Sequence, residues 1–330
     1  MRTLASHLLH SACRSGFRRF STAPTHLPIP VLYLDKSIIA VNKPKGFLCQ
    51  YDKTGKQAGD EQVASTLSIM SEVQRAFNLP YLPYVVHRLD RETTGALLYA
   101  TTSRQAATIS LQFSQRTIRK TYLAIVRGGA DRFPQRTGVI EGIMQKLRGP
   151  GGLITTRPCS DPTLIRRKAE VMSEWELLAT SPVAPLSLVA VRPRTGFMHQ
   201  IRVHMAEVLD VPILGDVRYT GTHTAGLDPS ITSVMSVPED DLFLHAAEIS
   251  FFRYSRSHKR AMLSICAPLP ESWIQFCREF EIPLPDRYVK GGLSVDGAPV
   301  QGPHPTLEHL GGRWMPSPDW QSDAASPASP

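Results

Sequence analysis

The stretch YVVHRLDRETTGALLYATT, residues 84–102, places a charged loop between two apolar runs. Residues 84–86 and 96–99 have the aromatic and aliphatic composition of strands, and Gly95 can adopt backbone conformations that other residues avoid. The loop between these predicted strands contains His87, Arg88, Asp90, Arg91 and Glu92. Loops held between rigid elements often carry catalytic residues, whereas a solvated turn with self-neutralising charges is the alternative. Features elsewhere in the sequence are needed to decide between a catalytic loop and a solvated turn.

Strand and helix signals follow one another along the chain without regular alternation. Strands are predicted at 31–35, 38–44, 84–86, 96–99, 120–128, 243–252 and 261–268, and helices at 60–78, 103–116, 197–209 and 271–280. A doubly wound parallel sheet requires strands and helices to alternate. The order therefore favours an α+β fold with a mainly antiparallel, mixed central sheet flanked by helices.

The domain organisation follows from length and local composition. At 330 residues with 42% apolar side chains, the chain can bury a sizeable core, and we expect one catalytic domain over 29–287. Residues 129–165 are rich in Gly, Pro and Arg, which predicts an irregular insertion or flap. The Gly, Pro and Ser content rises again towards the end, and a disordered tail is predicted for 288–330.

The beginning of the chain has the composition of a targeting segment. The first 34 residues contain four of the 37 Lys and Arg residues and none of the Asp or Glu residues, together with many Ser and Thr residues. This composition is typical of a mitochondrial transit peptide, which we assign to residues 1–28, with the matrix as the expected compartment. A disordered basic arm that contacts RNA is the alternative.

Several classes of function are disfavoured by missing patterns. The sequence has no G-x-G-x-x-G, P-loop or G-x-S-x-G motif, and its five cysteines form no C-x-x-C pair. No apolar run is long enough for a membrane-spanning helix. His199 and His204 lie about 140° apart on a helix, so they cannot chelate one metal ion together. A pair of His87 with Asp90 has no evident nucleophile partner, so neither metal nor triad chemistry is expected.

A second polar cluster lies in RPRTGFMHQIRVHMAEVLDVPILGDVRYTG, residues 192–221. On the predicted helix, Ile201, Met205 and Val208 fall on one side, and Arg202 falls on the same side as His199, away from them. An arginine on an amphipathic helix usually faces solvent. The apolar support behind Arg202 favours a guanidinium aimed at a site.

The segment HRLDRETTG, residues 87–95, resembles the catalytic motif H-R-L-D-x-x-T-[ST]-G of the RluA-type RNA pseudouridine synthases. Further segments agree with that family in order and spacing. They are VLYLDKSIIAVNKPKG (31–46), KTYLAIVRG (120–128), TGFMHQIRVHMAEV (195–208) with VPILGDVRYTG (211–221), and DLFLHAAEISF (241–251). The resemblance covers about residues 30–283.

The resemblance implies an isomerase that converts uridine to pseudouridine without a cofactor or a metal ion. It assigns Asp90 as the catalytic nucleophile, Arg202 as the cation beside it, and Tyr122 as the aromatic ring that packs on the base. These roles suit the residue types. A buried carboxylate needs a cation to stay charged, and a tyrosine offers a flat apolar face with a hydroxyl.

The resemblance also implies contacts to the RNA substrate, which we assign to His87, Arg88, Lys43, Lys120 and His199. Where the family usually has arginine after the glycine of T-G-R-x-H-Q, this chain has Phe197, so one RNA or structural contact differs. Residues 1–28 and the family together predict a synthase for mitochondrial large-subunit rRNA, with tRNA and mRNA as other targets, no membrane span and a monomeric state. A non-catalytic RNA-binding factor for ribosome assembly is the alternative. A hydrolase would need an activated water and a second placed acid, and the motif offers neither.

Overall fold

The computed structural model describes residues 29–49, 70–71, 73–75, 77–148, 154–159, 168–220, 241–254 and 260–315. The predicted leader, 1–28, lies outside the described residues. Most of the predicted helix at 60–78 does so too, although residues 70, 71 and 73–75 are helical.

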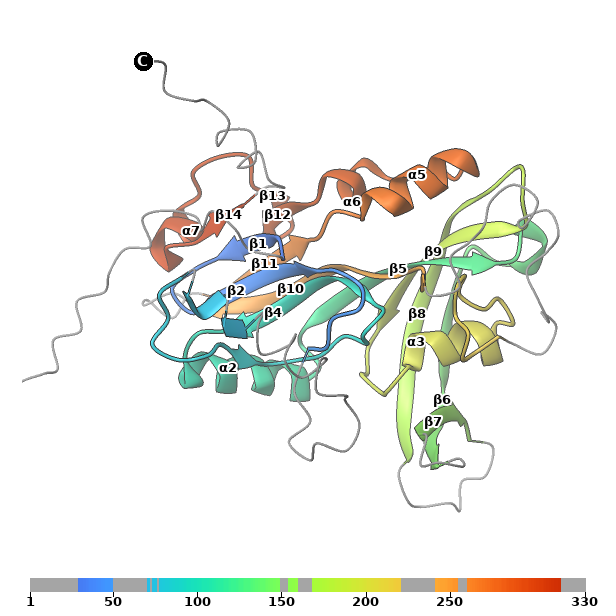
Figure 1. Ribbon diagram of the computed structural model, residues 1–330, viewed down its shortest axis with the longest axis horizontal. Helices are drawn as coiled ribbons and strands as arrows, with labels where there is room; N and C mark the ends of the chain where they lie inside the picture. The colour runs from blue at the N-terminus through green and yellow to red at the C-terminus, as the bar shows by residue number, and fades with distance from the viewer. Residues whose placement is uncertain are drawn as a thin grey trace, which may run out of the picture.

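One large mixed sheet forms the body of the protein (Figure 1). Its main path runs in the order β14-β1-β2-β4-β10-β5-β9-β8-β6-β7, with β11, β12, β13 and β3 attached beside it. The strands are β1 (Val31–Leu34), β2 (Ile38–Lys43), β3 (Tyr84–Val85), β4 (Thr94–Ala100), β5 (Arg119–Arg127), β6 (Thr137–Arg148), β7 (Ile154–Pro158), β8 (Lys168–Thr180), β9 (Leu186–Pro193), β10 (Leu244–Tyr254), β11 (Arg260–Cys266), β12 (Gly292–Val295), β13 (Ala298–Pro299) and β14 (Arg313–Trp314). Among the described strand pairs, β4 and β10 are parallel and the others antiparallel, which confirms the predicted fold class.

The helices lie on the two sides of this sheet. They are α2 (Ser103–Ser114), α3 (Gln200–Val203), α5 (Glu271–Glu279), α6 (Asp286–Lys290) and α7 (Pro305–Leu310), with a 3-10 turn, η1 (Ala130–Arg132), and a π-helical turn, η3 (His204–Val208). In Figure 1, α2 lies below the strands, α5 and α6 lie above them, and α3 lies beside β8. The predicted helix at 271–280 is confirmed as α5, and the one at 197–209 is α3 continued by η3.

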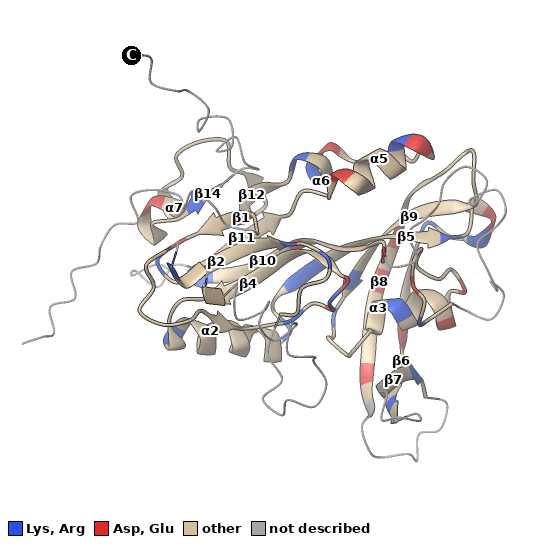
Figure 2. Cartoon of the chain, viewed as in Figure 1, with Lys and Arg blue, Asp and Glu red and all other residues tan. Residues whose placement is uncertain are grey.

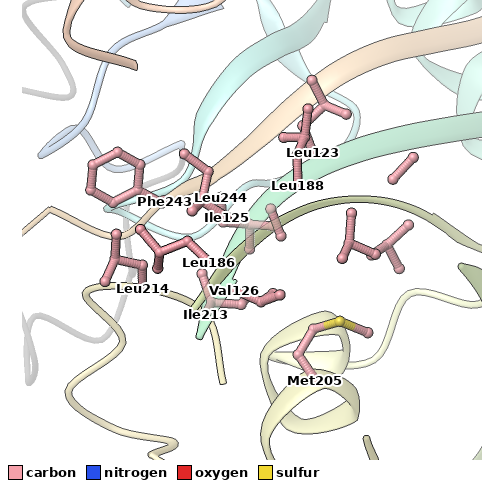
Figure 3. Close-up of a cluster of buried hydrophobic side chains, with 14 of the residues drawn as sticks. Leu123, Ile125, Val126, Leu186, Leu188, Met205, Ile213, Leu214, Phe243 and Leu244 are labelled. Atoms are coloured by element: carbon pink, nitrogen blue, oxygen red, sulfur yellow. The ribbon is translucent and has the colours of Figure 1, made fainter. Parts of the chain in front are cut away.

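The core is centred on β5 and β9, which pair along most of their length. Leu123 to Val126 and Leu188 to Val191 are fully buried, because both faces of these central strands are covered. Figure 3 shows Met205 reaching from the helical segment towards the apolar side chains of the sheet. Met205 is itself fully buried, so the helix that carries Arg202 is packed against the most rigid part of the fold.

The parallel contact between β4 and β10 depends on a glycine. Gly95 pairs with Ala246 and has a φ of +110°, a conformation that favours glycine. A Cβ atom on residue 95 would lie 2.3 Å from the Ala246 carbonyl oxygen. Gly95 therefore allows the end of the loop of residues 86–93, hereafter the Asp90 loop, to sit directly against β10.

Two predictions about irregular segments need correction. Within 129–165, most described residues form β6 and β7, which pair as regular antiparallel strands, and β6 also pairs with β8 over nine residues. The predicted disordered tail is wrong for residues 288–315, which form parts of α6, β12, β13, α7 and β14. Tyr288 and Leu293 are buried, because the segment adds strands to the sheet instead of needing a core of its own. Residues 316–330 lie outside the described residues.

We predict that Gly95→Ala destabilises the protein by about 3 kcal/mol or more, since backbone strain and overpacking each cost about 1–3 kcal/mol. Gly142→Ala in β6 is the matched control, because nothing lies within 4 Å of the Cβ position there. Its effect should stay within about 1 kcal/mol. Denaturant unfolding of both variants measures the difference, and equal stabilities would contradict the role assigned to Gly95.

Candidate active site

The Asp90 loop is held from beneath by a buried lysine, Lys43, at the end of β2. Its Nζ donates hydrogen bonds to the carbonyl oxygens of Pro44, Arg91 and Thr93, at 2.9, 2.8 and 2.8 Å. Burial lowers the pKa of Lys43 to about 8, and the residue is only 1% exposed. These carbonyls use all three of its protons, so Lys43 fixes the geometry of the loop. A direct RNA contact of Lys43 stays a prediction.

The residue immediately before Asp90 is fastened by a cysteine. The Leu89 N–H donates to Cys49 Sγ at 3.2 Å, and the Cys49 thiol donates back to the Leu89 carbonyl oxygen at 3.3 Å. Both residues are buried, and burial raises the pKa of the Cys49 thiol, which keeps its proton available for this bond. The sequence analysis assigned no role to Cys49.

Two further charged residues of the loop, His87 and Arg88, have different surroundings. His87 Nε2 accepts a hydrogen bond from the Leu98 N–H at 2.9 Å, and its ring lies 5.1 Å from that of Phe113. Burial lowers the pKa of His87 to about 3, so the imidazole is neutral and serves as an acceptor for β4. His87 therefore supports β4 through this hydrogen bond, whereas Arg88 is exposed and accessible to a ligand. The RNA contacts of both residues stay predictions.

The central feature of the site is the guanidinium of Arg202, carried by α3. Its Nε and Nη2 donate to the two carboxylate oxygens of Asp216, both at 2.7 Å. Its Nη1 lies 3.6 Å from Asp90 Oδ2. Burial opposes the charge of Arg202, but the hydrogen bonds and charge of Asp216 outweigh it and the pKa of Arg202 is raised. Asp216, fully buried, also accepts the backbone N–H groups of Arg218 and Tyr219.

His199 approaches Asp90 from a second direction. Its backbone is left-handed, with φ 54°, and its Nε2 lies 3.7 Å from Asp90 Oδ2. Its Nδ1 lies 2.9 Å from the hydroxyl of Tyr219, which in turn accepts the Thr156 N–H at 3.2 Å. Burial lowers the pKa of His199 to about 4, so the ring next to Asp90 is neutral near pH 7. The Tyr219 ring also lies 5.3 Å from the guanidinium of Arg202.

Tyr122, on β5, completes the group of predicted catalytic residues. It packs against two of the buried hydrophobic clusters and is itself partly exposed. Burial, followed by the negative charge of Asp90, raises the pKa of Tyr122, so its hydroxyl is protonated near neutral pH. The charge of Asp90 acts on Tyr122, so the two side chains lie in the same region of the fold.

The fold places Arg202 and His199 within 4 Å of Asp90, and His199, which the sequence assigns to RNA contact, thus lies beside the proposed nucleophile. Lys120 lies two residues before Tyr122 and lines an adjoining cavity. The sequence analysis missed the supporting roles of Asp216 and Tyr219, although the quoted segment VPILGDVRYTG contains both. Figure 2 shows basic and acidic segments interspersed over the fold, with a basic segment on α3 and acidic segments along β8.

Across the described part of the chain, no group of three or more His, Cys, Asp or Glu side chains is arranged to hold a metal ion. In the same residues, no helix is both long and apolar enough to cross a membrane.

Comparison with known proteins places this geometry in a family. Residues 37–207 match the family described as RNA pseudouridylate synthase. Among similar proteins, tRNA pseudouridine synthase C of Haemophilus ducreyi is 30% identical over 259 residues, covering 77% of this chain and 96% of that protein. Ribosomal large subunit pseudouridine synthase D of Borreliella burgdorferi is 31% identical, covering 59% and 56%. The mitochondrial pseudouridylate synthase RPUSD4 of Xenopus tropicalis is 28% identical, covering 84% and 90%.

A solved structure agrees at the level of the fold. Human RNA pseudouridylate synthase domain containing 4 superimposes with a TM-score of 0.58 at 21% identity, covering 78% of this chain and 94% of that one. The family match spans the Asp90 loop, β5 and α3, so it includes all three elements that meet at the site. The chain belongs to the RluA-type RNA pseudouridine synthases and is an isomerase of that family.

Proposed function

We propose that the protein converts uridine to pseudouridine in mitochondrial RNA, with large-subunit rRNA as its target and Asp90 as its nucleophile. The observation that carries the proposal is the Asp90 carboxylate, whose Oδ2 lies 3.6 Å from Arg202 and 3.7 Å from His199. The Asp90 side chain is 24% exposed, so it is backed by these two groups and open to a substrate on its other side.

The proposed reaction rearranges bonds without any net change in atoms or electrons. The bond from uracil N1 to ribose C1′ breaks, the uracil rotates within the site, and a bond from C5 to C1′ forms. A proton leaves C5 and N1 gains one, so the product is an isomer of the substrate. Two positions of attack by Asp90 are compatible with this scheme, ribose C1′ and the uracil ring.

Arg202 supplies fixed positive charge to the nucleophile. Two of its nitrogens are committed to Asp216, which holds the guanidinium in place and leaves Nη1 directed at Asp90. A charge that is oriented before the substrate arrives requires no reorganisation during the reaction. Arg202 therefore places positive charge close to Asp90, while its two short hydrogen bonds are made to Asp216.

His199 positions the carboxylate, and Tyr219 orients His199. If the Tyr219 hydroxyl donates to Nδ1, the proton of the neutral ring is on Nε2, the nitrogen that faces Asp90. Tyr122 supplies the surface on which the base packs. Its hydroxyl, whose pKa is raised by burial and by the charge of Asp90, lies at the edge of that surface, where it can take part in the final removal of the proton from C5.

The compartment and the class of RNA are supported by the leader and by the names of relatives. The acid-free first 34 residues are typical of a mitochondrial transit peptide, and the Xenopus relative is named as mitochondrial. The Borreliella relative is named for the large ribosomal subunit, and the Haemophilus relative is named for tRNA. We place the target in large-subunit rRNA and treat tRNA as the alternative.

We predict that Asp90→Asn abolishes pseudouridine formation, lowering the rate by at least about 10³-fold, because the amide is neither a nucleophile nor an anion. The substrate is mitochondrial RNA from cells that lack this protein, and pseudouridine is mapped by carbodiimide treatment and primer extension. Asp286→Asn is the matched control, since Asp286 is exposed and pairs only with Lys290 on α6.

The outcomes of that experiment separate the candidate functions. The parent and the Asp286→Asn variant should modify one or a few uridines of large-subunit rRNA. Modification of tRNA alone would replace the ribosomal target. RNA binding with no modification by any of the three proteins would favour the non-catalytic assembly factor, and equal modification by Asp90→Asn would remove the assigned nucleophile.

We predict that Tyr219→Phe lowers kcat about 10-fold while KM changes less than about twofold, because the hydroxyl that bonds His199 is lost and one oriented hydrogen bond is worth about 1.4 kcal/mol. The same change removes the bonds to Thr156, so thermal unfolding is measured alongside. Tyr254→Phe, an equivalent change at a half-exposed tyrosine at the end of β10, should leave both constants unchanged. Single-turnover and steady-state kinetics on the mapped RNA measure the effect. A rise in KM at constant kcat would show that Tyr219 acts in binding and not through His199.

The leader is tested separately from the enzyme. We predict that residues 1–30 fused to a fluorescent reporter direct it to the mitochondrion, and that a version with its four arginines replaced by glutamine does not. Fluorescence microscopy against a matrix marker measures the location. A cytosolic distribution of the unaltered fusion would contradict the assignment of residues 1–28.

A further inference from the structure

A cavity of about 440 Å³ lies at the start of β5, the strand that also carries Tyr122. It is lined by the end of α2, the start of β5, the start of β8 and residues 194–197. None of the roles assigned above uses this cavity. Its volume falls in the range of small-molecule sites and is sufficient for one nucleotide.

The lining combines positive charge with an aromatic surface. Among the charged side chains that line the cavity, Arg116, Lys120 and Arg194 are cations and Glu170 is an anion. The ring of Phe197 contributes to the wall, and Lys146 Nζ lies 5.4 Å from its centroid. Cations together with a partly exposed ring are features that bind the phosphates and bases of single-stranded nucleic acid.

Lys120 has hydrogen-bonding capacity that the protein does not use. Within the described residues, its Nζ donates to a single acceptor, the Thr195 carbonyl oxygen at 3.2 Å, whereas Lys43 uses all three of its protons on carbonyls. Burial lowers the pKa of Lys120 to about 8, which is the expected cost of a half-buried ammonium without an anion. A phosphate oxygen in the cavity would provide both the missing acceptor and the missing charge.

The cavity is connected to the active site by three elements. Lys120 and Tyr122 are two residues apart on β5, so they point to the same face of the strand at a separation of about 7 Å. Phe113, in the opposite wall, contacts the ring of His87 in the Asp90 loop. Residues 194–197 lead directly into His199 and α3.

The Phe197 wall is preformed. Gln200 Oε1 accepts the Phe197 N–H at 3.0 Å and the Thr195 hydroxyl at 2.8 Å. Gln200 Nε2 donates in turn to the Met172 carbonyl oxygen at 3.0 Å and to Ser173 Oγ at 2.9 Å. This buried amide ties the segment to β8, so the ring is held in place before any ligand binds.

We propose that this cavity binds the nucleotide next to the target uridine in the same RNA strand. Its phosphate contacts Lys120, and its base lies against the ring of Phe197. The proposal rests on the proposed function, because it takes the target uridine to be held over Asp90 and Tyr122. The enzyme thereby contacts two adjacent nucleotides, the target uridine at Asp90 and its neighbour in this cavity, and the unstacked neighbour helps to hold the target base out of its helix.

The first test measures binding to a fluorescein-labelled oligouridylate of about ten nucleotides by fluorescence anisotropy. Lys120→Met should weaken binding about 10-fold and reduce the salt dependence by about one ion, and Lys120→Arg should stay within about threefold of the parent. Lys290→Met is the matched control, because Lys290 is an exposed residue of α6 that pairs with Asp286. It should change affinity less than about twofold. Equal affinities of Lys120→Met and Lys290→Met would overturn the proposal.

The second test locates the base. Ultraviolet crosslinking of the same oligouridylate to the Asp90→Asn protein, followed by mass spectrometry, should place a crosslink on the peptide that contains Phe197. Phe197→Leu should remove this crosslink while thermal unfolding shows a folded protein. Crosslinks that avoid residues 113–120 and 194–197 would overturn the cavity assignment.

The two tests are independent of turnover. A protein that passes both but modifies no uridine would retain this binding site and lose the proposed function. A protein that modifies uridine, with Lys120→Met binding like the parent and no crosslink at Phe197, would retain the function and lose the binding site.

Discussion

The arrangement of the site depends on one guanidinium that is shared unequally between two carboxylates. Arg202 makes a bidentate pair with buried Asp216 at 2.7 Å and stands 3.6 Å from Asp90. Burying a charge pair is costly unless its hydrogen bonds are complete, and Asp216 meets this condition by accepting two backbone N–H groups as well. The strong pair provides rigidity, and the weaker contact leaves Asp90 available for chemistry.

The same separation of tasks applies to the loop that carries Asp90. Lys43 and Cys49 hold the backbone of the loop from inside the protein, and His87 ties it to β4, so Asp90 itself need not hold the loop in place. Gly95 then lets the loop end directly against β10. A residue that seems suited to bind RNA by its type can therefore be committed to structure, and burial with satisfied donors distinguishes the two cases.

Lys43 and Lys120 illustrate that distinction. Both have a pKa lowered to about 8 by burial, yet one has three carbonyl partners and the other has one partner beside an open cavity. A lysine next to a cavity with few hydrogen-bond partners in the protein is suited to bind a ligand. A lysine whose three protons are all bonded to carbonyl oxygens has a structural role. Phe197 stands where the family usually has arginine. It contributes an aromatic ring to the wall of that cavity, and Lys146 lies over this ring.

The sequence by itself determined the α+β class and the likeness of the Asp90 loop, Tyr122 and Arg202 to a catalytic set. Those properties reside in local composition and in contiguous motifs, which do not depend on long-range contacts. Only the tertiary structure decided that Asp216 and Tyr219 orient Arg202 and His199, that Lys43 and His87 are structural, and that residues 288–315 join the sheet. Each of those outcomes depends on which distant segments become neighbours, because burial and hydrogen-bond partners are set by packing and not by residue type.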